Sequence, residues 1–112
     1  MYLKDCIFCK IASGEIPTNP VWENEKIFAF NDLNPQAPIH VLVIPKAHYE
    51  SLNELDDKEL MGELLYGVKE VVKKLNVKEY RVVINTGKTA GQAVFHVHIH
   101  VLAGREMNWP PG

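Results

Sequence analysis

The segment from Val94 to Leu102 contains an alternation of polar and apolar residues, with histidine at positions 96, 98 and 100 and Val97 and Ile99 between them. A period of two residues is typical of a half-buried β-strand. Because alternate residues of a strand project from the same face, the three imidazoles should share one side of a sheet. The intervening valine and isoleucine should then pack on the opposite side.

A second pattern, with the spacing of a helix, follows Asp56. Asp56 and Glu59 fit a capping box, and Lys73 and Lys74 lie where the helix dipole favours cations. Asn76 is an acceptable end for the helix. Between these limits an apolar stripe recurs mostly at every third or fourth residue: Leu60, Met61, Leu64, Leu65, Val68, Val71, Val72 and Leu75.

The remaining elements are shorter. Residues 6–13 should form a short helix that ends at Gly14, and the prolines in 32–38 indicate a restricted loop. Strands are expected at 21–23, 26–30, 40–44, 80–85 and 94–102, with the 86–92 loop before the last. About five strands and one long helix predict a single α+β domain over residues 1–112, with a largely antiparallel five-stranded sheet and the long helix on one face.

The composition narrows the function classes. With 112 residues, 46% of them hydrophobic and 23% charged, the chain should form one soluble core. Its net charge of −2 shows no excess of basic residues of the kind that binds a nucleic-acid backbone. A phosphate-bearing ligand should therefore be small and held locally. No signal peptide or membrane-spanning run is seen, so we expect a cytoplasmic protein that contacts neither nucleic acid nor membrane.

The three histidines favour a chemical role. Ordinary buried histidines are the alternative, but three titratable rings on one face repel one another when protonated. They are better explained by a metal or an anionic phosphate held at that face. The apolar residues between them would give the site a rigid backing.

Cys6 and Cys9 form a CxxC pair near the start of the chain. Two cysteines are too few for a disulfide framework, and a redox motif would need a preceding strand that is missing here. A zinc site would need two more ligands, for which His48 and one histidine of the 96–100 group are available. Two small buried residues with no ligand remain the alternative.

Gly87-Lys88-Thr89 resembles the end of a phosphate-binding P-loop, but Val82 stands where that motif needs a glycine, and a strand rather than a helix follows. The loop from Asn85 to Gln92 still has glycines and amide side chains that allow main-chain N–H groups to approach a phosphate. A flexible hairpin connection explains the same residues equally well.

Taken together, these motifs resemble the Hint branch of the histidine triad (HIT) family. The resemblance covers nearly the whole chain: residues 96–102, the Cys6–Ile11 entry, Phe30–His40, Val43–His48, and the tail from Gly104-Arg105 to Trp109-Pro110-Pro111-Gly112. The tail favours Hint over the Fhit and galactose-1-phosphate uridylyltransferase branches, and so does His100, where the transferases carry glutamine. A HIT-like fold is implied, in a homodimer whose two sheets join and which has two nucleotide sites.

The resemblance implies hydrolysis of the P–N bond of purine nucleoside 5′-phosphoramidates, such as adenosine 5′-monophosphoramidate or nucleotidyl-lysine. His98 would be the nucleophile and form a nucleotidyl-histidine intermediate, with His40, His96 and His100 as the other catalytic residues. A neutral imidazole is a good nucleophile near pH 7, and a covalent intermediate divides one difficult displacement into two.

The resemblance also implies the ligand-binding residues. A structural Zn²⁺ would be held by Cys6, Cys9, His48 and His96, as in a subset of relatives. Ala93 stands where several relatives have a serine that assists the leaving amine. Nucleotide would be bound by Ile7, Phe8, Ile11, Phe30, Asp32, Leu33, Asn85, Gly91, Gln92, Ala93, Val94, His98, His100 and Trp109.

Two other functions are compatible with the same residues. One is a nucleotide-binding regulatory or scaffold protein whose hydrolysis is incidental. The other is a dinucleoside polyphosphate hydrolase of the Fhit type, which the tail disfavours. In each case purine nucleoside monophosphates are expected ligands.

Overall fold

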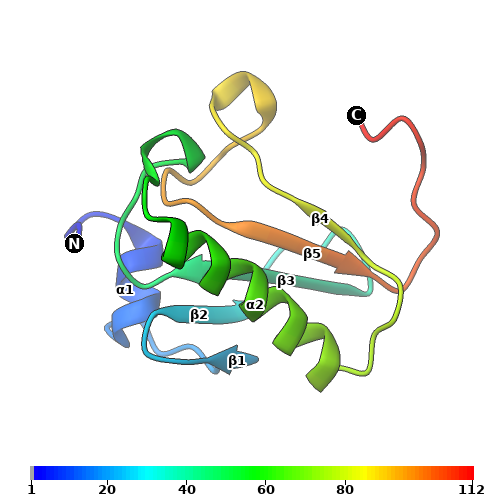
Figure 1. Cartoon of the computed structure of the whole chain (residues 1–112), viewed down its shortest axis with the longest axis horizontal. Coiled ribbons are helices and arrows are strands. Elements are labelled where there is room, and N and C mark those ends of the chain that lie inside the picture. The colour runs from blue at the N-terminus through cyan, green and yellow to red at the C-terminus, as the bar shows by residue number, and fades with distance from the viewer. Residues whose placement is uncertain (1) are drawn as a thin grey trace.

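The computed structural model describes residues 2–112 and places one antiparallel sheet between two helices of unequal length (Figure 1). The strand order is β1-β2-β3-β5-β4. The strands are β1 (Trp22–Glu23), β2 (Ile27–Asn31), β3 (Ile39–Pro45), β4 (Arg81–Val83) and β5 (Ile99–Ala103). The helices are α1 (Ile7–Ser13) and α2 (Lys58–Lys74), and the 3₁₀ turns are Leu52–Glu54 and Lys88–Ala90. The predicted α+β class, antiparallel five-stranded sheet and two helices are confirmed.

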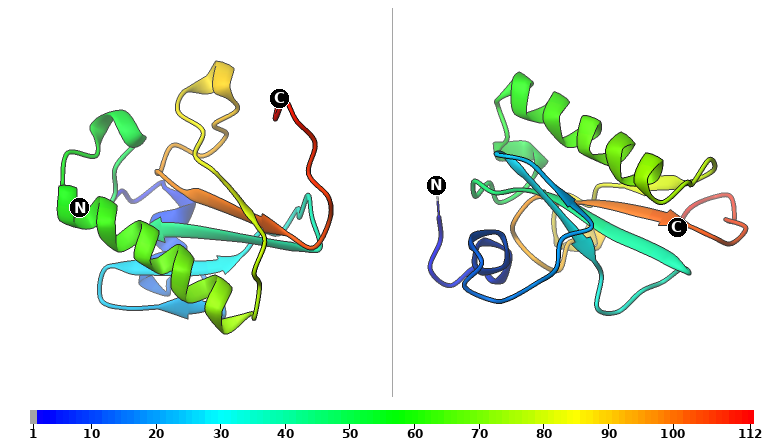
Figure 2. Two further views of the ribbon diagram at one scale, coloured as in Figure 1. Left: turned by 45° about the vertical axis from the view of Figure 1, so that its right-hand side comes forward. Right: turned by 90° about the horizontal axis from the view of Figure 1, so that it is seen from below.

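The two faces of the sheet carry separate cores because strand residues alternate in direction. Ile27, Ala29, Val41 and Val43 pack beneath α2 together with Val97, Ile99 and Val101. Phe28, Phe30, Leu42 and Ile44 face the other way and pack against Phe8 and Ile11 of α1. Figure 2 shows α2 and α1 on opposite sides of the sheet. Val97 and Ile99 therefore pack on the face that α2 covers, away from the pocket side of the sheet, as the alternation predicts.

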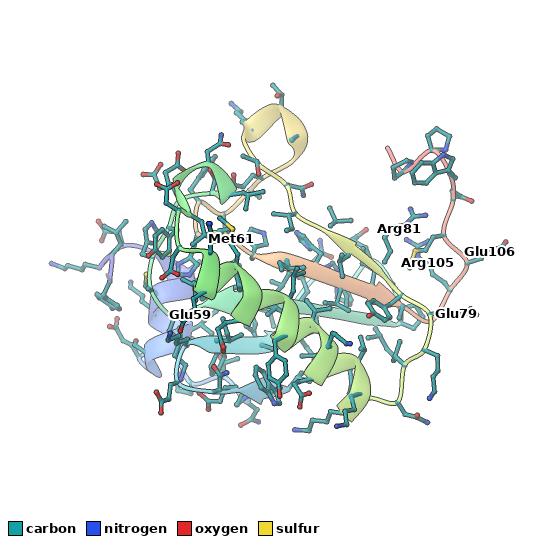
Figure 3. All side chains as sticks on the ribbon, viewed as in Figure 1. Glu59, Met61, Glu79, Arg81, Arg105 and Glu106 are labelled. Carbon is teal, nitrogen blue, oxygen red and sulfur yellow. The ribbon has the colours of Figure 1, made fainter. Side chains whose placement is uncertain are left out.

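Helix α2 begins one residue later than the capping box suggested. The N-cap is Asp57, whose side chain accepts a hydrogen bond from the main-chain N–H of Leu60, so the assignment of Asp56 was wrong. The pattern favoured Asp56 because Glu59 stands three residues later, but it is Asp57 that has the extended main chain of an N-cap. Glu59 lies on the first turn of α2 (Figure 3). It pairs instead with Lys26, between β1 and β2, at 3.0 Å. Among the stripe residues, Leu65 is 55% exposed and lies outside the core.

The predicted strand limits needed correction at the histidine segment. Only Ile99–Ala103 forms the β5 ladder, between β3 and β4, so His96 and His98 lie before it. The main chain there has another partner: the N–H of Val97 donates to the carbonyl of Tyr49 at 2.7 Å. Strand β4 is also shorter than the expected 80–85. It forms one edge of the sheet in this chain, and continuation of the sheet across a dimer stays a prediction.

Within residues 2–112, no helix is both long enough and apolar enough to span a membrane.

The packing of α2 on the sheet gives a stability prediction with a built-in control. A Cβ on Gly67 would lie 3.1 Å from Ile27 and 3.3 Å from both Trp22 and Val43, whereas one on Gly62 would meet nothing within 4 Å. Gly62→Ala should stabilise the protein by about 0.5–1 kcal/mol, because alanine favours the helix. Gly67→Ala should destabilise it by about 1–2 kcal/mol, because the fully buried sheet residues cannot move aside. Urea unfolding of both variants checks this, and equal stabilisation by both would contradict it.

Candidate nucleotide-binding and metal-binding site

A pocket of about 260 Å³ opens on the α1 side of the sheet. Its walls come from α1, from β2 and the turn after it, and from the 91–94 loop, and they are mostly apolar. The polar side chains in it are Asp32, His98 and His100. An apolar pocket with a few convergent polar groups is the usual form of a small-molecule site. The lining residues are Ile7, Phe8, Ile11, Phe30, Asp32, Leu33, Leu42, Gly91, Ala93, Val94, His98 and His100.

The orientation of His98 is set by a main-chain carbonyl. Its Nδ1 lies 2.7 Å from the oxygen of His96. Because a carbonyl can only accept, the proton of the neutral ring is on Nδ1, and Nε2 keeps a lone pair. Burial lowers the pKa of His98 below its ordinary value, against smaller opposing effects of the His96 carbonyl and Asp32. The ring is therefore neutral near pH 7, and Phe8 packs edge-on against it with centroids 5.2 Å apart.

The His100 ring has its proton on the other nitrogen, Nε2, because of its contact with His40. The main-chain N–H of Gln36 donates to Nδ1 of His40 at 3.0 Å, which leaves the proton of that ring on Nε2. This Nε2 lies 2.9 Å from Nδ1 of His100 and 3.3 Å from Oδ2 of Asp32. Donation along the shorter contact puts the proton of His100 on its Nε2, where it can serve as a hydrogen-bond donor.

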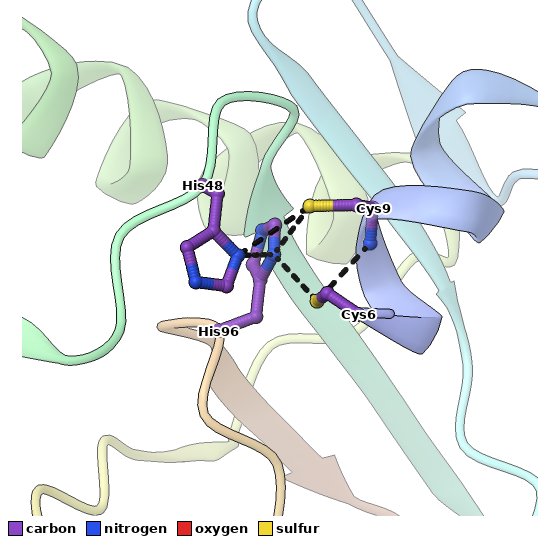
Figure 4. A group of neighbouring side chains, drawn as sticks. All are labelled: Cys6, Cys9, His48 and His96. Atoms are coloured by element: carbon purple, nitrogen blue, oxygen red, sulfur yellow. Dashed lines mark hydrogen bonds between the residues drawn. The ribbon is translucent and has the colours of Figure 1, made fainter. Parts of the chain in front are cut away.

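Four metal-ligating side chains meet beside this pocket. The sulfurs of Cys6 and Cys9 lie 3.3 and 3.5 Å from Nδ1 of His96, and Nδ1 of His48 lies 3.4 Å from the Cys9 sulfur and 3.2 Å from Nδ1 of His96 (Figure 4). Burial is the main reason that the pKa values of both histidines are lowered, that of His96 to about 4, and that the pKa of the Cys9 thiol is raised. Metal-free, the cluster favours uncharged groups.

The cluster fits a tetrahedral zinc ion. For the bond lengths that zinc takes to thiolate sulfur and imidazole nitrogen, a tetrahedron has S–N edges of about 3.6 Å and N–N edges of about 3.4 Å. The ring of His96 is also in the tautomer that a metal requires, because its Nε2 donates to the carbonyl of Pro45 at 2.7 Å and leaves Nδ1 deprotonated. His48 lacks such support: its buried Nε2 has no hydrogen-bond partner within residues 2–112.

Three residues expected to bind nucleotide lie outside the pocket. Gln92 is 3% exposed, and its amide holds the loop together: its oxygen accepts from the N–H of Gly87, and its nitrogen donates to the carbonyls of Glu50 and Val94. The amide nitrogen of Asn85 approaches the carbonyl of Gly91 at 3.5 Å. Trp109 is 81% exposed, with the guanidinium of Arg81 5.9 Å from its ring.

The other expected nucleotide-binding residues all line the pocket, which also contains a residue that the sequence analysis missed. Leu42 belongs to the continuous apolar run of β3, where no alternation of polar and apolar residues indicates which side chains face α1.

The sheet, the histidine-lined pocket and the Cys₂His₂ cluster together describe a small α+β protein in which a candidate ligand pocket lies beside a candidate metal site. The HIT domain matches residues 13–107, and the chain belongs to the HIT family.

Similar proteins agree with this assignment. The chain is 49% identical to the maize "14 kDa zinc-binding protein" over 95% of this chain and 87% of that one. It is 44% identical to "Adenylylsulfatase HINT1" of Arabidopsis thaliana, over 95% and 76% of the two chains. A HIT family hydrolase from Legionella pneumophila has a TM-score of 0.92 at 46% identity, over 96% of this chain and 100% of that one.

The pKa of His100 gives a testable consequence of the pocket. Burial, together with the neighbouring His98 and His40 rings, lowers this pKa from 6.5 to about 4. In a ¹⁵N-resolved NMR titration the His100 ring should therefore titrate near pH 4 in the folded protein and near 6.5 in urea.

The same shift affects stability. Since the folded pKa is the lower one, the unfolded chain binds more protons between pH 6.5 and about 4, and stability from the neutral ring is lost as the pH falls through this window. A folded-state midpoint near 6.5 would contradict the burial of His100 as an uncharged ring.

Proposed function

We propose that the protein hydrolyses the P–N bond of purine nucleoside 5′-phosphoramidates, with His98 as the nucleophile. The observation that supports this most directly is the hydrogen bond from Nδ1 of His98 to the His96 carbonyl, which leaves an uncharged ring in the pocket with its nucleophilic lone pair on Nε2. Within the described part of the chain this Nε2 makes no hydrogen bond, and it is not sealed from solvent.

The pocket suits a nucleoside monophosphate group. Its apolar wall, with Phe8 edge-on to Phe30 at 5.5 Å, provides aromatic surface for a base. The Asp32 carboxylate accepts one hydrogen bond from the main-chain N–H of Asn34 and keeps further lone pairs for ribose hydroxyls. His98 and His100 would lie at the phosphate end.

The chemistry follows from the two opposite tautomers. Nε2 of His98 attacks the α-phosphorus, the P–N bond breaks, and the amine leaves with its electron pair and takes up a proton. The proton comes from water, since Ala93 has no hydroxyl to offer and the neutral His100 ring would be left as an imidazolate if it gave up its only N–H proton. The N–H of His100 stabilises negative charge on the phosphate oxygens. Water then attacks the nucleotidyl-histidine, releases the nucleoside monophosphate and restores His98.

We assign a structural role to zinc held by Cys6, Cys9, His48 and His96. Four protein ligands leave no open coordination position for substrate or water, so zinc would supply structural stability rather than a reactive group. The name of the maize relative, a zinc-binding protein, supports zinc as the metal. A homodimer, with Trp109 near the site of the partner, and a cytoplasmic location remain part of the proposal.

A second candidate substrate is adenylyl sulfate, which the name of the Arabidopsis relative specifies for that protein. The same attack of His98 on the α-phosphorus would release sulfate instead of an amine. Sulfate needs no proton to leave, so the absence of a hydroxyl at Ala93 would be less costly for this substrate.

The nucleophile assignment is tested by His98→Asn. Its side-chain amide can still donate to the His96 carbonyl, but it has no nucleophilic nitrogen, so turnover of adenosine 5′-phosphoramidate should fall by on the order of 10³-fold or more. The affinity for AMP, measured by calorimetry, should change little. Undiminished turnover in this variant would refute the mechanism.

The wild-type protein separates the alternatives. AMP binding with negligible turnover of both the phosphoramidate and adenylyl sulfate would favour a regulatory or scaffold role, and preferential cleavage of a diadenosine polyphosphate would favour a hydrolase of the Fhit type.

The metal assignment predicts one zinc ion per chain in the purified protein. Since binding at about 1,000 times the Kd adds about 4 kcal/mol of stability, removal by a chelator should lower the Tm by more than about 5 °C, and added zinc should restore it. His48→Ala should lower the metal content and abolish most of this response. A Tm that is unaffected by chelation would contradict a structural zinc.

A further inference from the structure

His96 belongs to both sites at once. Its Nδ1 lies in the Cys₂His₂ cluster, and its main-chain carbonyl holds the Nδ1 proton of His98. Its Nε2 donates to the carbonyl of Pro45 at the end of β3. One residue, His96, therefore both offers a ring nitrogen to a metal and sets the tautomer of His98 through its carbonyl. Its side chain is 0% exposed.

Helix α1 makes a second connection between the two sites. Cys6 caps this helix and Cys9 lies in its first turn, so two of the four ligands belong to it. Between them, Phe8 lines the pocket and packs edge-on against both His96 and His98, with centroids 5.9 and 5.2 Å away. A seven-residue helix has little stability by itself, and its position depends on the cysteines and on packing against the sheet.

Without a cation only weak contacts hold the cluster together. The tautomer of His96 set by Pro45 presents the Nδ1 lone pair to the sulfurs of Cys6 and Cys9 at 3.3 and 3.5 Å and to Nδ1 of His48 at 3.2 Å. Neutral thiols are weak hydrogen-bond donors, so His96 and α1 are held less firmly by these contacts than by bonds to a metal. A shift of His96 would disturb the carbonyl that holds His98, and a shift of α1 would disturb the Phe8 wall beside it.

We propose that the metal ligand His96 is a positioning residue for the nucleophile, so that zinc binding at the cluster and nucleotide binding in the pocket raise each other's affinity. The nucleotide half of this proposal rests on the proposed function. Linkage makes the effect reciprocal: the factor by which zinc strengthens AMP binding must equal the factor by which AMP strengthens zinc binding. Couplings of this kind are typically about 5- to 150-fold.

The first test observes His98 directly and needs no substrate. In ¹⁵N-labelled protein at pH 7.5, the zinc-loaded form should show His98 with its proton on Nδ1. After chelation of zinc, the ring signals should move toward a mixture of the two tautomers. Circular dichroism at the same temperature verifies that the chain stays folded. A His98 tautomer that is the same with and without zinc would overturn the proposal.

The second test measures the coupling. The Kd for AMP is determined with zinc-loaded and zinc-free wild-type protein, and the Kd for zinc is determined with and without saturating AMP. Both should change by the same factor of at least about 5. Independence of the two affinities would overturn the proposal.

Two variants separate positioning from general destabilisation. His48→Asn removes a ligand that belongs neither to α1 nor to the histidine segment. This variant should bind AMP as weakly as zinc-free wild-type protein does. The matched control is Val68→Ala, in the α2 core on the opposite face of the sheet, which should lower stability but keep the AMP affinity and the Nδ1 tautomer. Equal loss of AMP affinity in both variants would indicate a merely structural metal.

The outcomes also separate the two proposals. If zinc-loaded wild-type protein fails to bind AMP, the proposed function is wrong, and the His98 tautomer still decides whether the metal positions the ring. If AMP binds equally with and without zinc and the tautomer is constant, the coupling is wrong and the proposed function is unaffected.

Discussion

The hydrogen bond from Nδ1 of His98 to the carbonyl of His96 is the interaction on which the proposed chemistry depends. A neutral imidazole has one N–H group. When Nδ1–H of His98 donates to the carbonyl, the lone pair available for attack is on Nε2, at the other side of the ring. The carbonyl is itself well held: the His96 ring bonds to Pro45, and the next N–H, of Val97, bonds to Tyr49. This stretch lies outside the β5 ladder, so these contacts take the place of strand pairing in fixing the proposed nucleophile.

The main hydrophobic core lies on one face of the sheet and the candidate pocket on the other. The α2 face is aliphatic and closely packed, as the near-contact of Gly67 with Ile27 and Val43 shows. The opposite face is covered by the short α1 together with the 91–94 loop, and the pocket between them is lined by the rings of His98 and His100. Helix α1 has three buried residues, Phe8, Cys9 and Ile11, and a metal bound through Cys6 and Cys9 would hold it more firmly.

The sequence predicts those features that rest on local periodicity. The alternation around Val97 and Ile99 is confirmed, and so is most of the α2 stripe, of which only Leu65 and Leu75 lie exposed outside the main core. Features that depend on distant partners are missed. Glu59 favoured Asp56 as the cap, but this glutamate pairs with Lys26, and Asp57 caps the helix. Nothing local indicates that the amide of Gln92 is used up by main-chain groups of its own loop and of Glu50. The cluster joins residues up to 90 positions apart: the residue types alone suggested Cys6, Cys9, His48 and one histidine of the 96–100 group, and the resemblance singled out His96.

His98 and His100 are adjacent, with centroids 4.9 Å apart, yet their protons are set in opposite directions. A main-chain acceptor draws the proton of His98 away from Nε2, and the His40 ring, itself oriented by the N–H of Gln36, leaves the proton of His100 on Nε2. One ring can therefore act as nucleophile while its neighbour donates a hydrogen bond. Burial keeps both neutral, which matters because a proton on His98 would remove the lone pair, and two charged rings at this distance would repel each other. Main-chain groups, the His40 ring and burial thus provide both proposed roles, and Asp32 is the charged side chain among the residues that line the pocket.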